Sequence, residues 1–289
     1  MGSSVTKHFE QHFGGLVSYS GAYDDYASSR GNYYLNGKFL SETPWGFRNL
    51  IREKLVLKLV KINKVEKVLD SGCASGHTLF ELAELHPSSN FVGIDIGKEF
   101  ISVANNYVSK LELKNIEFNL TSIEDFRADH KFDKILLLEV LEHVLDEKSL
   151  ILKLKNLLAK NGEIIITTPN LNGDGTLYGR FLRMLKLKKF IPATDFSSEG
   201  TLIHGDQHVR EFNSKSLEDL MRLYGFKPIY SSGVIWINFP FQDFIHKILR
   251  RVPGVLLMIE YVEIFTALYN RKFSKKLGRH LVYVFAIGD

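Results

Sequence analysis

Short apolar runs alternate with segments of helical periodicity through the middle of the chain. Buried parallel strands are nearly continuous apolar runs, whereas helices repeat their apolar positions every three or four residues. By these criteria the sequence predicts strands at 67–70, 90–95, 115–119, 132–138 and 163–168, and helices at 78–85, 98–111 and 147–159. The alternation predicts an α/β fold built on a doubly wound, mainly parallel sheet with right-handed crossovers.

The alternation stops after Pro169 and resumes with a helix at 216–224 and strands at 228–237 and 280–287. These additions predict a seven-stranded, Rossmann-like sheet with helices on both faces and a hairpin-like final strand. We expect a single domain over 1–289, in which the remaining length covers the sheet. Its expected parts are an aromatic-rich N-terminal cover at 1–66, a binding core at 67–170, a lid insertion at 171–215, and a C-terminal part at 216–289 with a helical insertion at 239–276.

Composition narrows the class of protein. The 37 Lys and Arg residues against 33 Asp and Glu give a formal net charge of +4, which offers little support for DNA binding. The single cysteine, Cys73, excludes an intramolecular disulfide and a thiolate zinc cluster. The start lacks the apolar run of a secretory signal, and the most apolar stretch, 255–269, is shorter than the ~20 residues of a membrane-spanning helix. We therefore expect a cytoplasmic protein without a transmembrane segment.

The turn after the first predicted strand, DSGCASG from Asp70 to Gly76, is the first candidate ligand site. Gly72 and Gly76 allow a tight turn and a close approach of the backbone to a ligand, and Gly76 opens a helix whose amino end faces that ligand. Asp95 ends the second strand, where a carboxylate can accept hydrogen bonds from both hydroxyls of a ribose. The pattern predicts a nucleoside cofactor at the carboxyl ends of these strands.

The spacing of the loop separates the possible nucleosides. A dinucleotide fold uses G-x-G-x-x-G to hold a pyrophosphate, whereas this loop is G-x-A-x-G, with Ala74 at its centre and Asp70 before it. A carboxylate repels pyrophosphate and suits a cationic ligand, which disfavours an NAD-linked oxidoreductase. At this point VLDSGCASGHT resembles the first motif of the class I S-adenosylmethionine-dependent methyltransferases.

The resemblance extends from residue 67 to residue 228. FVGIDIGKEFISVA, NLTSIEDF, FDKILLLEVLEHVLD and IIITTPN are similar to the later motifs of that superfamily. The resemblance implies S-adenosylmethionine as cofactor and S-adenosylhomocysteine as product. The residues that it assigns to the cofactor are Asp70, Gly72, Ala74 and Gly76 for the methionine part, Asp95 for the ribose, Ile96, Ser122 and Ile123 for the adenine, and Glu139 beside the cofactor.

A hydroxyl acceptor needs a base that takes its proton during methyl transfer. The candidate bases are His208, in GDQHVREF, and His143, just beyond the fourth strand, with His208 the first choice. The match does not identify the acceptor. We expect a small molecule methylated on a hydroxyl, with a saccharide, a lipid-linked compound or a quinone-like ring as the candidate classes.

Glu139, Glu142 and His143 form an E-x-x-E-H cluster that resembles a metal-binding motif of ubiquinone-pathway O-methyltransferases and of RNA 3′-terminal 2′-O-methyltransferases, in which His208 would complete a magnesium site. Two carboxylates and imidazoles suit a divalent cation that orients a diol. The same motif also occurs without metal, capping a helix, and we expect no metal here. Metal-assisted RNA 2′-O-methylation and a non-catalytic nucleoside-binding protein remain the alternatives.

The segment 178–190, YGRFLRMLKLKKF, interleaves basic and apolar residues and carries part of the positive charge. The pattern favours a lid helix that packs its apolar side on the core. A basic amphipathic helix also suits an anionic membrane surface or an acidic acceptor. Peripheral membrane contact is therefore a further possibility for this chain.

Overall fold

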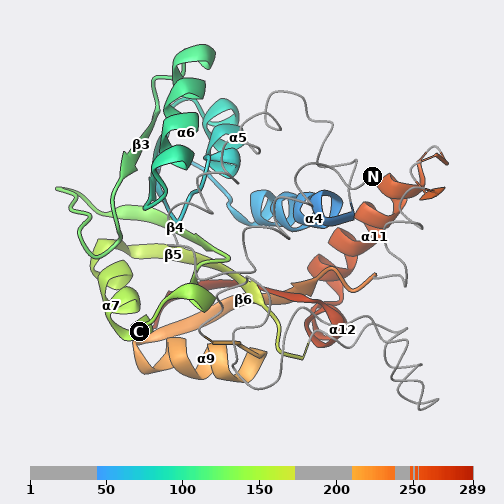
Figure 1. The fold of residues 1–289 in the computed structure, drawn as a ribbon. Coiled ribbons are helices and arrows are strands. Elements are labelled where there is room, and N and C mark those ends of the chain that lie inside the picture. The colour runs from blue at the N-terminus through green and yellow to red at the C-terminus, as the bar shows by residue number, and fades with distance from the viewer. Residues whose placement is uncertain (1–43, 173–209, 238–247, 250, 253, 289) are drawn as a thin grey trace, which may run out of the picture.

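Seven strands form one sheet in the order β3-β2-β1-β4-β5-β7-β6. β7 is antiparallel to both of its neighbours, β5 and β6, and the other described pairs are parallel. The computed structural model describes residues 44–172, 210–237, 248–249, 251–252 and 254–288, with the side chains of 44–48 excepted (Figure 1). The strands are β1 (Lys67–Ser71), β2 (Asn90–Asp95), β3 (Ile116–Leu120), β4 (Phe132–Leu138), β5 (Leu158–Pro169), β6 (Phe226–Val234) and β7 (His280–Ile287).

Helices cover both faces of the sheet. The helices are α4 (Pro44–Leu59), α5 (His77–Leu85), α6 (Lys98–Leu111), α7 (Glu147–Leu157), α9 (Ser214–Leu223), α11 (Val255–Tyr269) and α12 (Arg271–Leu277), with a 3-10 turn η1 (Leu141–His143). One apolar cluster joins the sheet to α4, α5, α6 and α11, and a second joins its other face to α7 and α9. The doubly wound fold class is thereby confirmed.

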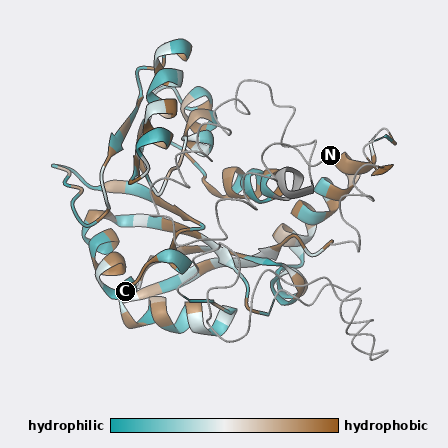
Figure 2. Ribbon diagram, in the orientation of Figure 1, coloured by the Kyte–Doolittle hydropathy of each residue, from teal (hydrophilic) through white to brown (hydrophobic). Residues whose placement is uncertain are grey.

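The central strands are apolar along their whole length because both of their faces are buried. In β4, Leu136 packs in the first cluster, whereas Ile135 and Leu137 pack in the second. Side chains alternate between the faces of a strand, so a strand covered on both sides needs apolar residues at every position. The brown colour of hydrophobic residues is therefore seen on the strands in the middle of the sheet in Figure 2.

Several element boundaries differ from the sequence-based expectation, and two of them have a clear physical cause. The predicted helix at 147–159 ends at Leu157 because Leu158 already pairs with Phe132 as the first residue of β5. The predicted strand at 228–237 ends at Val234 because Ile235 turns to a φ of 66°. The amide of Ile235 then donates to the Glu263 carboxylate, 3.0 Å away, instead of to a strand.

The N-terminal tyrosines, the basic segment 178–190 and His208 lie outside the described residues. Within the described part of the chain, no helix combines the length and the apolar character needed to cross a bilayer.

Candidate active site

The glycine loop between β1 and α5 lies at the carboxyl edge of the sheet. Gly72 and Gly76 have φ values of 84° and 80°, and Ala74 between them has a φ of 47°. The amides of Gly72 and Cys73 both donate to the carbonyl of Ile94 on β2, at 2.8 and 3.0 Å. These bonds hold the loop over the ends of the two strands, where the open α/β fold binds its ligands.

Neighbouring side chains leave no room for a side chain at either glycine. A Cβ atom on Gly72 would lie 2.4 Å from Cγ2 of Val140, just beyond β4, and one on Gly76 would lie 2.3 Å from the Phe118 ring of β3. Because left-handed φ values also favour glycine, both positions are restricted by backbone conformation and by space. The loop is therefore closely packed between Val140, just beyond β4, and Phe118 of β3, beside the point where the strand order reverses between β1 and β4.

The Asp95 carboxylate, at the end of β2, connects the glycine loop to the start of α6. One oxygen accepts a hydrogen bond from the amide of Ala74 at 2.9 Å, and the other accepts one from Gly97 at 2.8 Å. Burial raises the pKa of Asp95, while these backbone bonds oppose the rise. A carboxylate has about four acceptor sites, so acceptor capacity remains for a ligand's hydroxyls. Ile96 follows with 60% of its surface exposed, an apolar side chain beside that carboxylate.

Asp70 is the penultimate residue of β1, just before the glycine loop, and is only 3% exposed. Its Oδ1 atom has no hydrogen-bond partner in the described part of the chain. Burial, and then the nearby charges of Asp95 and Glu53, raise the pKa of Asp70 to about 8. A buried carboxyl among other acids is stabilised by a cation. The position therefore fits a positively charged group such as the ammonium of an amino-acid ligand.

The turn after β3 approaches Asp95 through the backbone. The amide of Thr121 donates to the Asp95 carbonyl at 3.1 Å. The hydroxyl of Ser122 donates to Asp125 at 3.1 Å and accepts from the Asp125 amide at 3.2 Å, so it stabilises its own turn. Ile123 is buried. The structure thus brings Thr121 beside the ribose candidate, while Ser122 already has a local partner.

Glu139, just after β4, is held in an unusual backbone conformation beside Arg52 and His280. Its φ is 58°, and its amide donates to the carbonyl of Thr167 at 2.9 Å. Its carboxylate lies 3.0 Å from Nη1 of Arg52 on α4 and 2.7 Å from Nδ1 of His280 on β7. Burial alone would raise the pKa of Glu139, but the charges of Arg52 and His280 hold it well below its usual range.

Glu142, in the 3-10 turn, is 1% exposed. One oxygen accepts a hydrogen bond from Thr168 at 3.0 Å. Burial, followed by the charge of Glu139, raises the pKa of Glu142 well above its usual value. His143 ends the 3-10 turn and is half-buried. Among the described residues no three His, Cys, Asp or Glu side chains come together in a group that could hold a metal ion. The E-x-x-E-H cluster is not such a group.

His280 is the site residue that sequence reasoning missed. It opens β7, where it pairs in register with Pro169, and because β7 is antiparallel to β5 its first residue lies at the carboxyl edge. Burial lowers the pKa of His280, whereas the Glu139 carboxylate opposes that shift. The available signal was topological: a His at the start of a reversed last strand falls at the same edge as the glycine loop.

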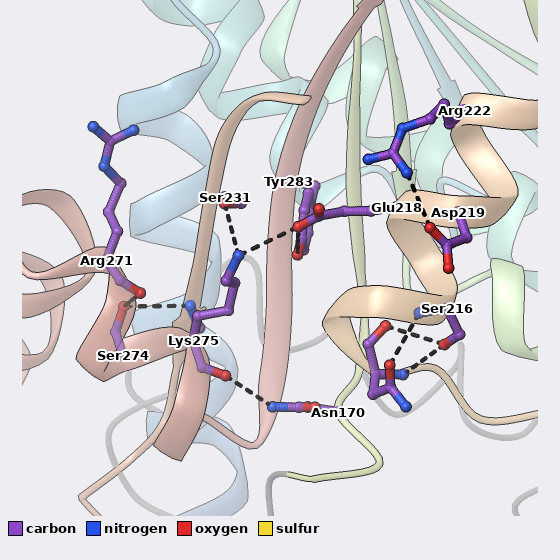
Figure 3. Close-up of polar contacts among 12 residues, drawn as sticks. Asn170, Ser216, Glu218, Asp219, Arg222, Ser231, Arg271, Ser274, Lys275 and Tyr283 are labelled. Atoms are coloured by element: carbon purple, nitrogen blue, oxygen red, sulfur yellow. Dashed lines mark hydrogen bonds and ion pairs between the residues drawn. The ribbon is translucent and has the colours of Figure 1, made fainter. Parts of the chain in front are cut away.

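Asn170 and a polar network on α12 fix the entry into β7. The Asn170 amide donates to the carbonyl of Arg279 at 2.8 Å, and its side chain donates to the carbonyls of Gly278 and Lys275. On the other side of α12, the Lys275 ammonium reaches Glu218, which also accepts a 2.7 Å hydrogen bond from Tyr283 (Figure 3). The segment around His280 is therefore held by Asn170 before it and by Tyr283 after it.

Comparison with known proteins gives the family. A model of a methyltransferase domain matches residues 62–219. The ubiquinone biosynthesis O-methyltransferase of Rickettsia typhi is 36% identical over 129 residues, 45% of this chain and 51% of that protein. The tRNA U34 carboxymethyltransferase of Nautilia profundicola is 30% identical over 166 residues, 56% of this chain and 53% of that protein. The chain spans about half the length of these relatives.

Solved structures share the fold at low identity. The plantazolicin methyltransferase BpumL in complex with S-adenosylhomocysteine has a TM-score of 0.55 at 18% identity, covering 99% of this chain and 96% of that one. An O-methyltransferase from a multienzyme of Brevibacillus brevis, also with S-adenosylhomocysteine, has a TM-score of 0.56 at 15% identity, covering 89% and 79%. These likenesses show the fold, and the family match over residues 62–219, more than half of the chain, shows that the chain belongs to the methyltransferase-domain family.

Proposed function

We propose that this chain transfers the methyl group of S-adenosylmethionine to a hydroxyl of a small-molecule acceptor. The observation that carries the proposal is the meeting of the glycine loop, Asp70 and Asp95 at the carboxyl edge beside the reversal of strand order. The O-methyltransferase relatives favour oxygen as the accepting atom. We propose that the whole chain, 1–289, acts as one methyltransferase domain.

The cofactor residues follow from the chemistry of the donors. Asp70, buried with an oxygen that lacks a hydrogen-bond partner within the described residues, would pair with the ammonium of the methionine part. Asp95 would accept from the ribose hydroxyls with its remaining acceptor capacity, and Ile96 would cover one face of the adenine. Ser122 and Ile123 would approach the adenine edge. Gly72, Ala74 and Gly76 would bring backbone against the methionine part, and Glu139 would lie beside it.

S-adenosylmethionine supplies a methyl group on a positively charged sulfur, which leaves as a neutral thioether. The new oxygen–carbon bond forms as the carbon–sulfur bond breaks, and the hydroxyl proton passes to a base of the protein. Alignment of the acceptor oxygen with that bond supplies much of the acceleration. The work of this chain is therefore to orient the acceptor, exclude water and receive one proton.

We propose the Glu139–His280 pair as the base. A carboxylate that faces one ring nitrogen keeps the proton on that nitrogen and leaves the other with its lone pair. The lowered pKa of His280, due to burial, favours the neutral imidazole that a base requires. His208 and His143 stay as the candidates from sequence, and His208 lies outside the described residues.

The direct test is binding followed by turnover with the full chain. Titration calorimetry with S-adenosylhomocysteine should give binding that weakens about tenfold or more in Asp95→Asn. In this variant the two hydrogen bonds proposed from the ribose hydroxyls lose their charged carboxylate acceptor. Glu117→Gln, an exposed acid on β3, is the matched control and should bind normally. Absence of binding to the parent protein would contradict the proposed cofactor.

The acceptor class is tested with a methyl-labelled cofactor. The panel contains a catechol, a saccharide, an isoprenoid-linked alcohol, an amine and unmodified tRNA, with and without EDTA. Label on a hydroxyl, unaffected by EDTA, is the expected result. Label on tRNA alone would favour an RNA acceptor, the class of acceptor named in the Nautilia relative. Label lost with EDTA would favour the metal-assisted alternative.

A further inference from the structure

The outward side of α11 is an unbroken apolar stripe. We call the side chains of Leu257, Met258, Tyr261, Phe265 and Tyr269 the α11 outer face; each is exposed over 49–75% of its surface. The rings of Tyr261 and Phe265 stack with centroids 6.0 Å apart, and Phe265 meets Tyr269 at 4.7 Å. The four-residue spacing places the three rings in one row along the helix. Figure 2 shows the apolar character of this helix.

Both acidic residues of α11 are used on its inner side. Glu260 forms an ion pair with Lys54 of α4 at 2.7 Å. Glu263 is buried and accepts from the amides of Ile235 and Ile237 at 3.0 and 2.6 Å. The helix is therefore fixed to the body of the protein by its charged groups. The α11 outer face presents no charge and stands away from the core.

Basic residues flank α11 in the sequence, and one of them, Arg271, also has its guanidinium over the Tyr230 ring, 5.5 Å from the ring centroid. Arg251 precedes α11, and Arg271, Lys272 and Lys276 follow it, all with exposed side chains. No Asp or Glu occurs from residue 264 to residue 288. Lys275, in contrast, is directed to Glu218 and Ser231 inside the fold (Figure 3). An apolar aromatic stripe with cations at its ends is complementary to a surface of anionic headgroups above acyl chains.

We propose that the α11 outer face docks on the surface of an anionic phospholipid membrane. The helix would lie in the plane of the interface, with its aromatic and aliphatic side chains among the upper acyl groups and the four basic residues at the headgroups. The surface is separate from the residues proposed for cofactor and proton transfer. Because α11 packs on α4, which carries Arg52, docking would bring the carboxyl edge close to the membrane.

The test is vesicle flotation of the full chain. With vesicles of phosphatidylcholine plus about 30 mol% phosphatidylglycerol at about 50 mM salt, we expect binding that falls at least tenfold on pure phosphatidylcholine or at about 500 mM salt. The variant Tyr261→Ser/Phe265→Ser/Tyr269→Ser should lose at least tenfold in vesicle affinity. The matched control Leu85→Ser/Leu145→Ser/Leu223→Ser, which removes exposed leucines elsewhere, should bind like the parent.

Three results would overturn the proposal. The first is no vesicle binding by the parent, and the second is an equal loss of vesicle affinity in both triple variants. The third is a dimeric parent that does not bind vesicles and becomes monomeric in the α11 variant. That result would assign the face to a second copy of the chain. S-adenosylhomocysteine affinity is measured in parallel. Unchanged cofactor affinity in the α11 variant keeps this result distinct from the proposed methyl transfer.

Discussion

The carboxylate of Glu139 and Nδ1 of His280 lie 2.7 Å apart, although β5 separates the strands that carry them. Their side chains meet above the end of β5, and Arg52 of α4 reaches the same carboxylate at 3.0 Å. Three elements remote in sequence thus contribute to one charged cluster at the carboxyl edge. The cluster holds an imidazole whose charge state is set by burial on one side and by a carboxylate on the other.

If His280 receives the acceptor proton, His280→Asn lowers kcat at least tenfold, in line with the usual contribution of general-base catalysis. The affinity for S-adenosylhomocysteine should stay within about threefold, because the substitution leaves the glycine loop intact. Stopped assays with the labelled cofactor measure the first quantity and calorimetry the second. His130→Asn, a residue paired with Asp129 away from the site, is the control. Full kcat in His280→Asn would remove it from the mechanism.

The same assignment predicts a pH profile. Burial lowers the pKa of His280, with Arg52 and Arg279 acting in the same direction and Glu139 opposing them. The rate should therefore rise with pH along a limb below the ordinary histidine value of 6.5. In Glu139→Gln the opposing charge is lost, so the limb should move to lower pH. A limb that moves upward, or one that persists in His280→Asn, would exclude His280 as the titrating group.

Gly72→Ala should destabilise the protein and weaken cofactor binding, since its Cβ would lie 2.4 Å from Val140. Gly254 provides a matched control: its φ of 80° is close to that of Gly72, but among the described residues, its chain neighbours aside, no atom lies within 4 Å of an added Cβ. Gly254→Ala should cost about 1 kcal/mol of unfolding free energy, the left-handed backbone penalty alone. Urea unfolding should give a clearly larger loss for Gly72→Ala, part of which Val140→Ala restores. Equal losses would contradict the steric account.

Asp70 should make the protein less stable as pH rises. Its folded pKa of about 8 lies above the ordinary aspartate value of 3.8, so the folded state keeps a proton that the unfolded state has released between those pH values. The stabilisation that Asp70 contributes to the free energy of unfolding is fully present below about pH 4 and is lost toward pH 8. The free energy of unfolding falls by at most about 1.4 kcal/mol per pH unit in this range. Asp70→Asn should remove this slope from urea unfolding curves at pH 5 and pH 8.

The same protonation predicts that S-adenosylhomocysteine binds more tightly as pH rises through this range, since the ionised Asp70 attracts its ammonium group. Calorimetry in buffers of different ionisation enthalpy should detect a proton released on binding. Asp70→Asn should bind weakly without that release. An unchanged proton count in the variant would assign the titration to another group.

Glu263→Gln tests the anchor of α11. The carboxylate accepts from two backbone amides, whereas an amide side chain offers one oxygen and turns a donor toward the other N–H. The expected loss of unfolding free energy is about 1–3 kcal/mol. Burial raises the pKa of Glu263 to about 7, so the folded parent keeps a proton that the unfolded chain has released above about pH 4.5. The free energy of unfolding of the parent therefore falls from about pH 4.5 to pH 7. The difference in this free energy between parent and variant narrows over the same range. Glu260→Gln, with its part-exposed partner Lys54, should cost less than about 1 kcal/mol.

The parallel half of the sheet could be predicted from sequence because its strands are buried on both faces. β2 and β4 have the predicted bounds, since apolar runs such as FDKILLL fit only a doubly covered strand. The end of β6 could not be predicted. Ile235 leaves the strand because a carboxylate on α11, distant in sequence, takes its amide, and no local pattern records that contact.

Some residues of the candidate site could likewise be predicted from local sequence, and others could not. The glycine loop and Asp95 are adjacent to strand ends, so a local motif was enough to select them, and their proposed roles stay predictions. His280 had to be found through topology, because its partner Glu139 comes from a different strand. The sequence motif placed Glu142 beside Glu139, yet the structure directs Glu142 to Thr168 and Glu139 to Arg52.

The reversal of β7 has a consequence for how such a protein diversifies. Because β6 ends and β7 begins at the carboxyl edge, the whole connection from Ile235 to Arg279, with α11 and α12, is attached there. The connection that leaves Pro169 starts at the same edge. The inverted strand thus adds a second connection at this edge to the one that leaves β5. Either connection can be lengthened, shortened or exchanged while the glycine loop stays unchanged. Acceptor choice can change in this architecture by insertion, without redesign of the cofactor half.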